Sequence, residues 1–259
     1  PTTDSVLALG DLSTDGVVVW SRTNQPATFI TEWSTYEDFR YFVRTPSVDA
    51  YETQDYTVKL GLKSLPNDTE IFVRSYFLSA VNGKTSERLS ARFKTPCESG
   101  SRALRFAWSG DLGGQGYGIN PEIGGYRIFK EIEKDEPNLF FNCGDVIYAD
   151  GPLKLERPLP GKQTWYNLVT PEKEQVAQSL RQFRGNYRYN YLDENLRRFS
   201  AQCPQTYIWD DHETKNNWWP TRKLRDRRYQ ERRCRLLSTW ARQSFFEYLP
   251  VAQKPSQPR

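Results

Sequence analysis

The sequence predicts an all-β sandwich followed by an α/β domain, and three features of the pattern indicate this. Short β-rich segments alternate with turn residues up to about residue 96. After residue 101, strand patterns alternate with helix patterns, as in a parallel sheet with crossover helices. Three of these later strands end in acidic residues. We therefore expect one domain over residues 1–97 and a second over residues 102–259.

The first domain is predicted from short β-rich segments and the turns between them. Turn-forming residues occupy positions 13–16, 65–68 and 82–83. Six or seven strands at this spacing are typical of a small sandwich. The small polar residues 97–101 then form a natural linker. The expected strands are residues 6–9, 16–21, 28–33, 56–62, 70–79 and 89–95.

The second domain is predicted to begin with a strand, a helix and a parallel strand. The strand at 104–108 leads through a glycine-rich loop into a helix with apolar residues at 126, 129 and 132, and a strand to Asn142 follows. The proline-rich residues 151–171 are expected to form a long irregular loop over a site at the sheet edge. The remaining expected elements are helices at 171–183, 192–201 and 223–248 and a strand at 206–209.

Carboxylates follow the three strands of this predicted sheet. They are Asp111, Asp145 and the pair Asp210 and Asp211. Ligands of open α/β sheets bind outside the carboxyl ends of the strands, so these side chains are expected to converge on one edge. Carboxylates packed together repel one another unless a cation neutralises them. The cluster therefore predicts a site for hard metal ions.

Two further side chains near these carboxylates allow alternative interpretations. His212, the only histidine, is placed to donate a proton to a leaving oxygen or to contact a phosphoryl oxygen, but its acidic turn could also be a plain exposed turn. Tyr148 is either a phenol at the core edge or a phenolate ligand of oxidised iron. Arg127, or an arginine of the loop over the site, could pair with a substrate phosphate. The glycine-rich loop could cradle phosphate, although no Gly-Lys-Ser/Thr follows it.

Composition excludes several classes of protein. A chain of 259 residues with 37% hydrophobic residues is not a disordered chain, and a net charge of +4 gives no argument for a nucleic-acid partner. No apolar run approaches the roughly 18 residues of a membrane span. The four cysteines form no CxxC pair, which with one histidine excludes a zinc finger. Cys143, within an apolar strand, is expected to be a small buried residue rather than a metal ligand.

Three motifs in this order resemble the alkaline phosphatase D (PhoD-like) metallophosphatases. They are SGDLGGQGY at 109–117, GDVIYAD at 144–150 and WDDHETKNNW at 209–218, and they follow a domain that resembles a fibronectin type III module and opens with GDLSTDGVVVWSR at 10–22. The resemblance implies a secreted or periplasmic phosphomonoesterase or phosphodiesterase with a calcineurin-like core that uses Ca²⁺ and Fe³⁺. The expected mechanism is in-line attack on the ester by a metal-bound hydroxide.

The resemblance also assigns roles to single residues. It implies that Asp145 bridges the metals, Tyr148 ligates iron, Asp211 ligates a metal and His212 serves the phosphate. Asp111 stands where some members have a cysteine, so it is a candidate metal ligand in place of a thiolate.

The chain ends soon after the third motif, so it is expected to be the amino-terminal part of a larger enzyme, with further ligands beyond residue 259. The alternative is a non-catalytic protein that holds calcium, or an inactive fragment. The natural substrate and the oligomeric state do not follow from the sequence.

Overall fold

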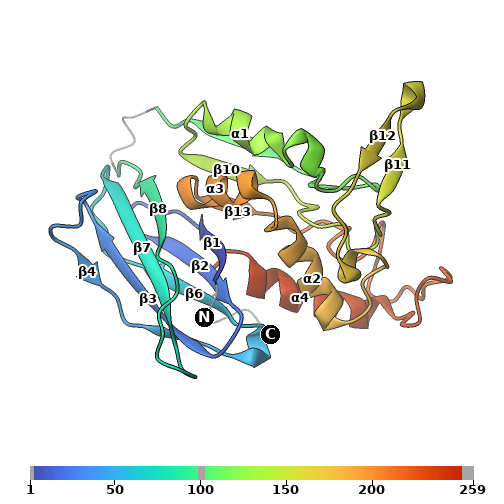
Figure 1. Ribbon diagram of the computed structural model, residues 1–259, viewed down its shortest axis with the longest axis horizontal. Coiled ribbons are helices and arrows are strands. Elements are labelled where there is room, and N and C mark those ends of the chain that lie inside the picture. Colours follow the sequence, from blue (N-terminus) through green and yellow to red (C-terminus); the bar gives the residue numbers. More distant parts are fainter. Residues whose placement is uncertain (1–2, 99–102, 253–259) are drawn as a thin grey trace.

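The computed structural model of the chain describes residues 3–98 and 103–252, which form two main sheets with helices beside one of them (Figure 1). The five-stranded sheet is antiparallel. It has the order β4 (Val43–Arg44), β3 (Ala27–Ser34), β7 (Glu70–Ser79) and β8 (Leu89–Lys94), with β5 (Val48–Ala50) also paired to β3. The six-stranded sheet has the order β6 (Thr57–Leu62), β2 (Val17–Thr23), β1 (Thr3–Gly10), β13 (Gln205–Tyr207), β10 (Leu139–Asn142) and β9 (Phe106–Ser109).

Strand β1 connects the two predicted segments of the chain. It pairs antiparallel with β2 and parallel with β13, where Gly10 is in register with Gln205. Leu7 and Leu9 face the core between the two sheets, whereas Val6 and Ala8 belong to the core beneath the helices. A strand buried on both faces needs the continuous apolar run that the sequence has here.

All six strands expected in the first segment are confirmed, and the short strands β4 and β5 are additional. The division into domains at 97 and 102 stays a prediction, and residues 99–102 lie outside the described part of the chain.

Helices cover one face of the parallel strands β9, β10 and β13. They are α1 (Arg127–Glu133), α2 (Leu180–Asn190), α3 (Glu194–Gln202) and α4 (Cys234–Tyr248). The rings of Phe129 on α1 and Phe199 on α3 lie 5.3 Å apart, and Phe140 of β10 lies 5.3 Å from Phe199. Their side chains fix these two helices on the sheet. No helix among the described residues is long and apolar enough to cross a membrane.

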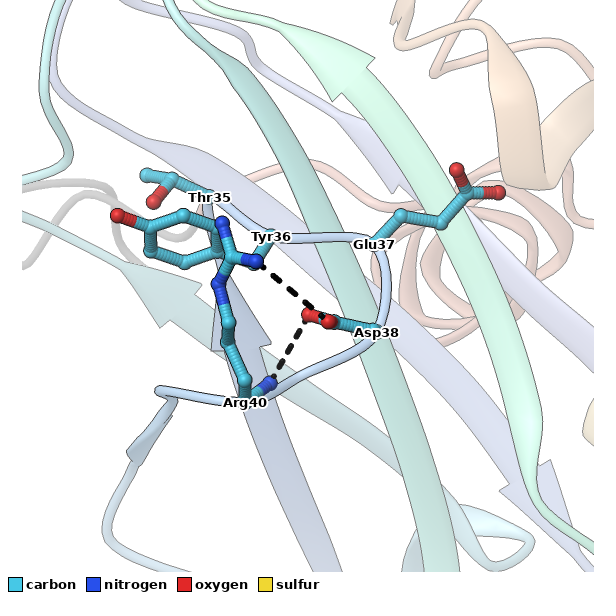
Figure 2. A pocket seen from close by; sticks show the side chains of 5 residues that line it. All are labelled: Thr35, Tyr36, Glu37, Asp38 and Arg40. Atoms are coloured by element: carbon cyan, nitrogen blue, oxygen red, sulfur yellow. Dashed lines mark hydrogen bonds and ion pairs between the residues drawn. The ribbon is translucent and has the colours of Figure 1, made fainter.

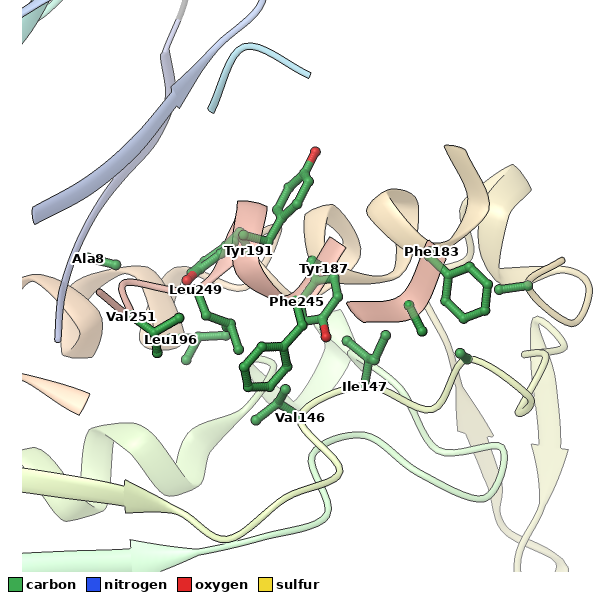
Figure 3. Close-up of a cluster of buried hydrophobic side chains, with 14 of the residues drawn as sticks. Ala8, Val146, Ile147, Phe183, Tyr187, Tyr191, Leu196, Phe245, Leu249 and Val251 are labelled. Carbon is green, nitrogen blue, oxygen red and sulfur yellow. The ribbon is translucent and has the colours of Figure 1, made fainter. Parts of the chain in front are cut away.

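The chain directly after the second Gly-Asp pair is anchored in the helical core. Val146 and Ile147 are 5% and 2% exposed and belong to the same buried cluster as Phe183, Tyr187 and Phe245 (Figure 3). Burial of two aliphatic side chains contributes about 1.5–3 kcal/mol each. The backbone at Asp145 is therefore held between a strand and a packed core.

Two predicted helices begin later than expected. Residues 171–183 contain only the 3-10 turn η4 (Pro171–Lys173) before α2, because the buried Lys173 Nζ donates to Tyr148 O and Asn186 Oδ1 and the Ser179 side chain caps α2 instead. The helix predicted from residue 223 starts at Cys234. Lys223 pairs with Arg233 in an isolated bridge, so the arginine-rich residues 222–233 form a loop rather than a helix.

The proline-rich loop also contains regular structure that the sequence did not predict. β11 (Glu156–Pro158) and β12 (Thr164–Tyr166) form a hairpin around the turn η3 (Pro160–Lys162), and it projects at the end of the molecule opposite β4 (Figure 1). Two further 3-10 turns are η1 (Glu52–Gln54) and η2 (Pro121–Ile123).

The second face of the parallel strands is exposed. Phe106, Trp108 and Ile208 are 54%, 69% and 57% exposed. Parallel sheets are normally covered on both faces. Cys143 is exposed as well, so its expected burial is wrong: it lies just past the end of β10, where no helix covers it.

An ionic network joins β2 and the η1 turn to α2 and α4. The Asp55 carboxylate accepts hydrogen bonds from Arg22, Arg188 and Tyr248. Burial alone would raise the pKa of Asp55, but these three donors lower it overall. The network holds β2 and the η1 turn against α2 and α4.

Candidate metal centre

The same Gly-Asp turn ends two neighbouring parallel strands. Asp111 follows β9 with φ 64°, and Asp145 follows β10 with φ 52°. The two turns are bonded together, since Asp111 N donates to Gly144 O at 3.2 Å and Leu112 N to Asp145 O at 2.9 Å. A positive φ is unfavourable for a residue with a side chain, and such strain concentrates at functional sites. Gly144, with φ 94°, passes so close to the turn after β13 that a Cβ there would lie 2.5 Å from Asp210 Cβ.

Asp145, Asp211 and His212 form a group that could hold a metal ion. One ligand atom from each lies within 4.8 Å of the others. Asp145 is only 6% exposed, and its Oδ1 accepts a hydrogen bond from His212 N at 3.0 Å. The three residues that the sequence placed at the ends of β10 and β13 are thus brought together.

His212 is positioned by its neighbours. Its Nδ1 lies 2.7 Å from Asp150 Oδ1, and its ring stacks on Tyr148 with centroids 4.2 Å apart. Asp150 is itself held by Asn216 N at 3.0 Å. Burial alone would lower the pKa of His212, but Asp150, Asp145 and Asp211 raise it above its usual value overall. The imidazole is therefore held in one orientation and its protonated form is favoured.

Tyr148 links Asp111 to this group. The Tyr148 hydroxyl donates to Asp111 Oδ2 at 3.1 Å. Burial, followed by the bond and charge of Asp111, raises the pKa of Tyr148 well above that of a free phenol. Asp111 is exposed and lies outside the group of Asp145, Asp211 and His212. Three of the five predicted site residues thus form one group, Tyr148 stacks on His212 of that group, and Asp111 is bonded to Tyr148.

Two acidic residues of the sequence motifs, to which no separate role was assigned, support the site. Glu213 is completely buried and accepts hydrogen bonds from Val146 N at 2.7 Å and Asp210 N at 2.8 Å. Its burial raises its pKa to about 7. Asp150 holds the imidazole of His212. In the sequence these acids look like their neighbours, so only the fold separates supporting carboxylates from ligand carboxylates.

The electrostatics of the group fit a cation. Burial raises the pKa of Asp145 to about 6, and the charges of Asp210 and Asp211 contribute to this, although the hydrogen bond and charge of His212 oppose it. The carboxylate is thus charged at neutral pH in surroundings that disfavour its charge. A bound cation relieves this cost, and carboxylate and phenol oxygens are ligands of hard cations.

The glycine-rich loop has a packing role. A Cβ at Gly114 would overlap the ring of Tyr148, and a Cβ at Gly118 would overlap the hydroxyl of Tyr189. Gly118 N donates to Asn167 Oδ1 at 2.7 Å rather than facing a ligand. The glycines let the loop lie against Tyr148, so the phosphate-cradle interpretation finds no support.

An open pocket elsewhere on the molecule carries no chemistry of this kind. Figure 2 shows it in the turn between β3 and β4, lined by Thr35, Tyr36, Glu37, Asp38 and Arg40. Arg40 lies 4.0 Å above the Tyr36 ring and 3.8 Å from Asp38 Oδ2. Arg40 and Asp38 are thus paired with each other, and β4 lies at the end of the molecule far from the hairpin (Figure 1).

The chain is similar to known phosphatases along its whole length. The family model of the PhoD-like phosphatase matches residues 106–259, and that of the PhoD-like phosphatase N-terminal domain matches residues 1–97. Alkaline phosphatase D of Bacillus subtilis (strain 168) is 25% identical in an alignment of 259 positions that covers 95% of this chain and 40% of that protein.

Two solved structures share the fold. A structure of PhoD matches with a TM-score of 0.75 at 23% identity, over 99% of this chain and 47% of that one. A purple acid phosphatase from yellow lupin (Lupinus luteus) seeds matches with a TM-score of 0.56 at 16% identity, over 91% of this chain and 39% of that one. This chain therefore spans less than half the length of each of these relatives. With more than half of its residues matched by the family model, the chain belongs to the PhoD-like phosphatase family.

Proposed function

We propose that this chain carries part of a metal-dependent site that hydrolyses phosphate esters. The observation that supports this most directly is the meeting of Asp145, Asp211 and His212 within 4.8 Å at the carboxyl ends of the parallel strands. Membership of a phosphatase family gives this group its expected chemistry. The bare face of the same strands, with Trp108 69% exposed, is consistent with relatives more than twice as long.

The ligands are assigned by the chemistry of the donors. Asp145 and Asp211 offer carboxylates to a cation, and Tyr148 offers a phenol oxygen beside them, with Asp111 at its hydroxyl. We assign calcium and ferric iron to this site, because oxygen donors with few histidines suit hard cations. When bound, such cations neutralise the phosphoryl oxygens and lower the pKa of water.

His212 acts on the phosphate ester as a proton donor. Its Nδ1 is engaged by Asp150, which leaves Nε2 available on the side of Asp211, 3.9 Å from Asp211 Oδ1. The surrounding carboxylates favour its protonated form. A protonated imidazole held in this way is suited to give a proton to the departing alkoxide oxygen. Asp150 is a positioning residue, because it is buried and holds the ring through Nδ1.

The domain types, the location of the protein and its candidate substrates are extended from the family to this chain as part of the same proposal. Residues 1–97 form a fibronectin III-like unit and residues 102–259 the metallophosphatase unit. The protein acts outside the cytoplasm, and both monoesters and diesters of phosphate are candidate substrates.

The test is hydrolysis of 4-nitrophenyl phosphate and bis(4-nitrophenyl) phosphate by the purified chain, with calcium and ferric iron supplied or chelated. We expect metal-dependent hydrolysis that falls at least a hundredfold in Asp145→Asn. Asp135→Asn is the matched control, because Asp135 is an exposed acid at the end of α1. Calcium binding without hydrolysis of either ester would contradict the proposal and favour a calcium-holding binding protein.

A further inference from the structure

The β11–β12 hairpin is fastened to the glycine-rich loop beside the candidate site. Asn167, which is 6% exposed, donates to Gly116 O at 3.0 Å and to Lys154 O at 2.7 Å. Its Oδ1 accepts from Gly118 N at 2.7 Å and from Trp165 Nε1 at 2.9 Å. The buried side-chain amide of Asn167 thus holds the hairpin and the glycine-rich loop in a fixed position relative to each other.

Arg157 of this hairpin lies over the ring of Tyr117. Its guanidinium lies 4.2 Å from the centroid of the Tyr117 ring. Trp165 is its cross-strand partner, and the Tyr117 and Trp165 rings meet edge to face at 5.6 Å. The backbone of Gly116 passes so close that a Cβ there would overlap Arg157 Nη1. The guanidinium is therefore held in place by its surroundings.

This guanidinium has no acidic partner. Among residues 3–98 and 103–252, no hydrogen bond or ion pair of the Arg157 side chain is found, and its Nε is buried without a partner. Arg184, by contrast, is paired with Glu247 through two bonds, and Arg228 with Asp226. A buried donor without an acceptor costs about 1–3 kcal/mol. A ligand with anionic oxygens would supply acceptors to the Nη–H groups of the same guanidinium.

The loop places Arg157 next to the candidate metal centre. Gly114 lies against the ring of Tyr148, and Gly116 lies against the guanidinium of Arg157. Two residues of chain span at most about 7 Å. The guanidinium is therefore one short turn away from Tyr148, which stacks on His212. Arg127, the other arginine considered from the sequence, is exposed on α1 and lacks such walls.

We propose that Arg157, Tyr117 and Trp165 form an anion-binding subsite for a second anionic group of the phosphate ester. This subsite rests on the proposed function, since it selects among esters hydrolysed at the neighbouring centre. It favours substrates that carry a phosphoryl or carboxylate group beyond the reacting phosphate. The Tyr117 ring orients the guanidinium, and its Nη–H groups donate to the anion.

The first test is independent of catalysis. In metal-free protein, the Nε–Hε resonance of Arg157, identified by its loss in Arg157→Met, is followed while inorganic phosphate is added. We expect a saturable shift of this resonance and no comparable shift for Arg127, identified in the same way from Arg127→Met. Absence of a saturable shift, or an equal shift of both resonances, would overturn the proposal.

The second test compares the hydrolysis of 4-nitrophenyl phosphate and 3-carboxy-4-nitrophenyl phosphate. We expect the carboxylated ester to have a lower KM, and Arg157→Met to raise that KM about tenfold or more, while the values for the plain ester stay unchanged. An unchanged KM ratio in Arg157→Met would overturn the subsite. A saturable phosphate shift without hydrolysis of either ester would support the anion site and overturn only the proposed function.

Discussion

Replacing Asp145 by asparagine is expected to stabilise the metal-free protein at neutral and alkaline pH. Burial and the neighbouring carboxylates raise the pKa of Asp145 from 3.8 to about 6. Because this folded pKa is above the unfolded one, the folded state binds more protons between these values, and stability falls as pH rises through this window. About two pKa units correspond to about 3 kcal/mol. Asparagine removes the charge, keeps the acceptor for His212 N and tolerates a positive φ.

The assay is urea unfolding in the presence of a chelator at about pH 4 and about pH 8. The free energy of unfolding of Asp145→Asn should exceed that of the unmodified chain by up to about 3 kcal/mol at the higher pH and by close to zero at the lower one. Asp135→Asn should change neither value. If Asp145→Asn were less stable than the unmodified chain at the higher pH, or if the difference did not depend on pH, the charge of Asp145 would not be what destabilises the metal-free protein.

Three further predictions concern packing and charge away from that carboxylate. Asp55→Ala should lower the free energy of unfolding by about 2–3 kcal/mol, since it leaves buried donors without their acceptor; urea unfolding measures this. Gly114→Ala should displace the Tyr148 ring and weaken calcium binding at least tenfold in a calorimetric titration. Burial lowers the pKa of Lys59 from 10.5 to about 8, so stability should rise between these pH values and Lys59→Met should abolish the rise in urea unfolding.

Matched controls make these outcomes specific. Asp38→Ala removes an exposed acid and should change stability by less than about 0.5 kcal/mol. Gly61→Ala adds a Cβ with only the end of the Lys63 side chain within 4 Å, at 3.9 Å, so it should leave calcium binding unchanged. Lys84→Met removes an exposed amine and should leave the alkaline pH dependence in place. If a control variant showed an effect as large as that of the variant it is matched to, the assigned contacts would be contradicted.

The strands were predictable because each has a short apolar pattern bounded by turn residues. Leu7 and Leu9 alternate with Val6 and Ala8, and β1 was found from that run. Its parallel pairing with β13 was not foreseen, because the partner lies about two hundred residues later. Only tertiary contact brings such distant segments together.

Helix starts were less predictable because side-chain contacts at a distance decide them. Lys173 belongs to a helix by local pattern, but its ammonium is buried against Tyr148 O and Asn186. Cys143 follows an apolar strand, yet it lies on the face that no helix covers. In both cases the local sequence fits the predicted structure, and contacts with distant parts of the chain determine the observed one.

The candidate site was largely predictable because its residues follow strand ends. Asp145 and Asp211 stand directly after two strands that pair in parallel, and His212 is next to one of them. The roles of Asp150 and Glu213 were hidden, since burial alone distinguishes them from their acidic neighbours. Arg157 is the arginine of the loop over the site that the sequence offered beside Arg127, but its lack of an acidic partner is visible only in the fold.

Calorimetric titration of the chelator-treated chain with calcium at about pH 8 tests the central claim most directly. The account predicts saturable binding that is lost in Asp145→Asn and in Asp211→Asn but kept in Asp135→Asn, because only the first two carboxylates belong to the group within 4.8 Å. Equal calcium binding by all four proteins would contradict a metal centre at the ends of β10 and β13.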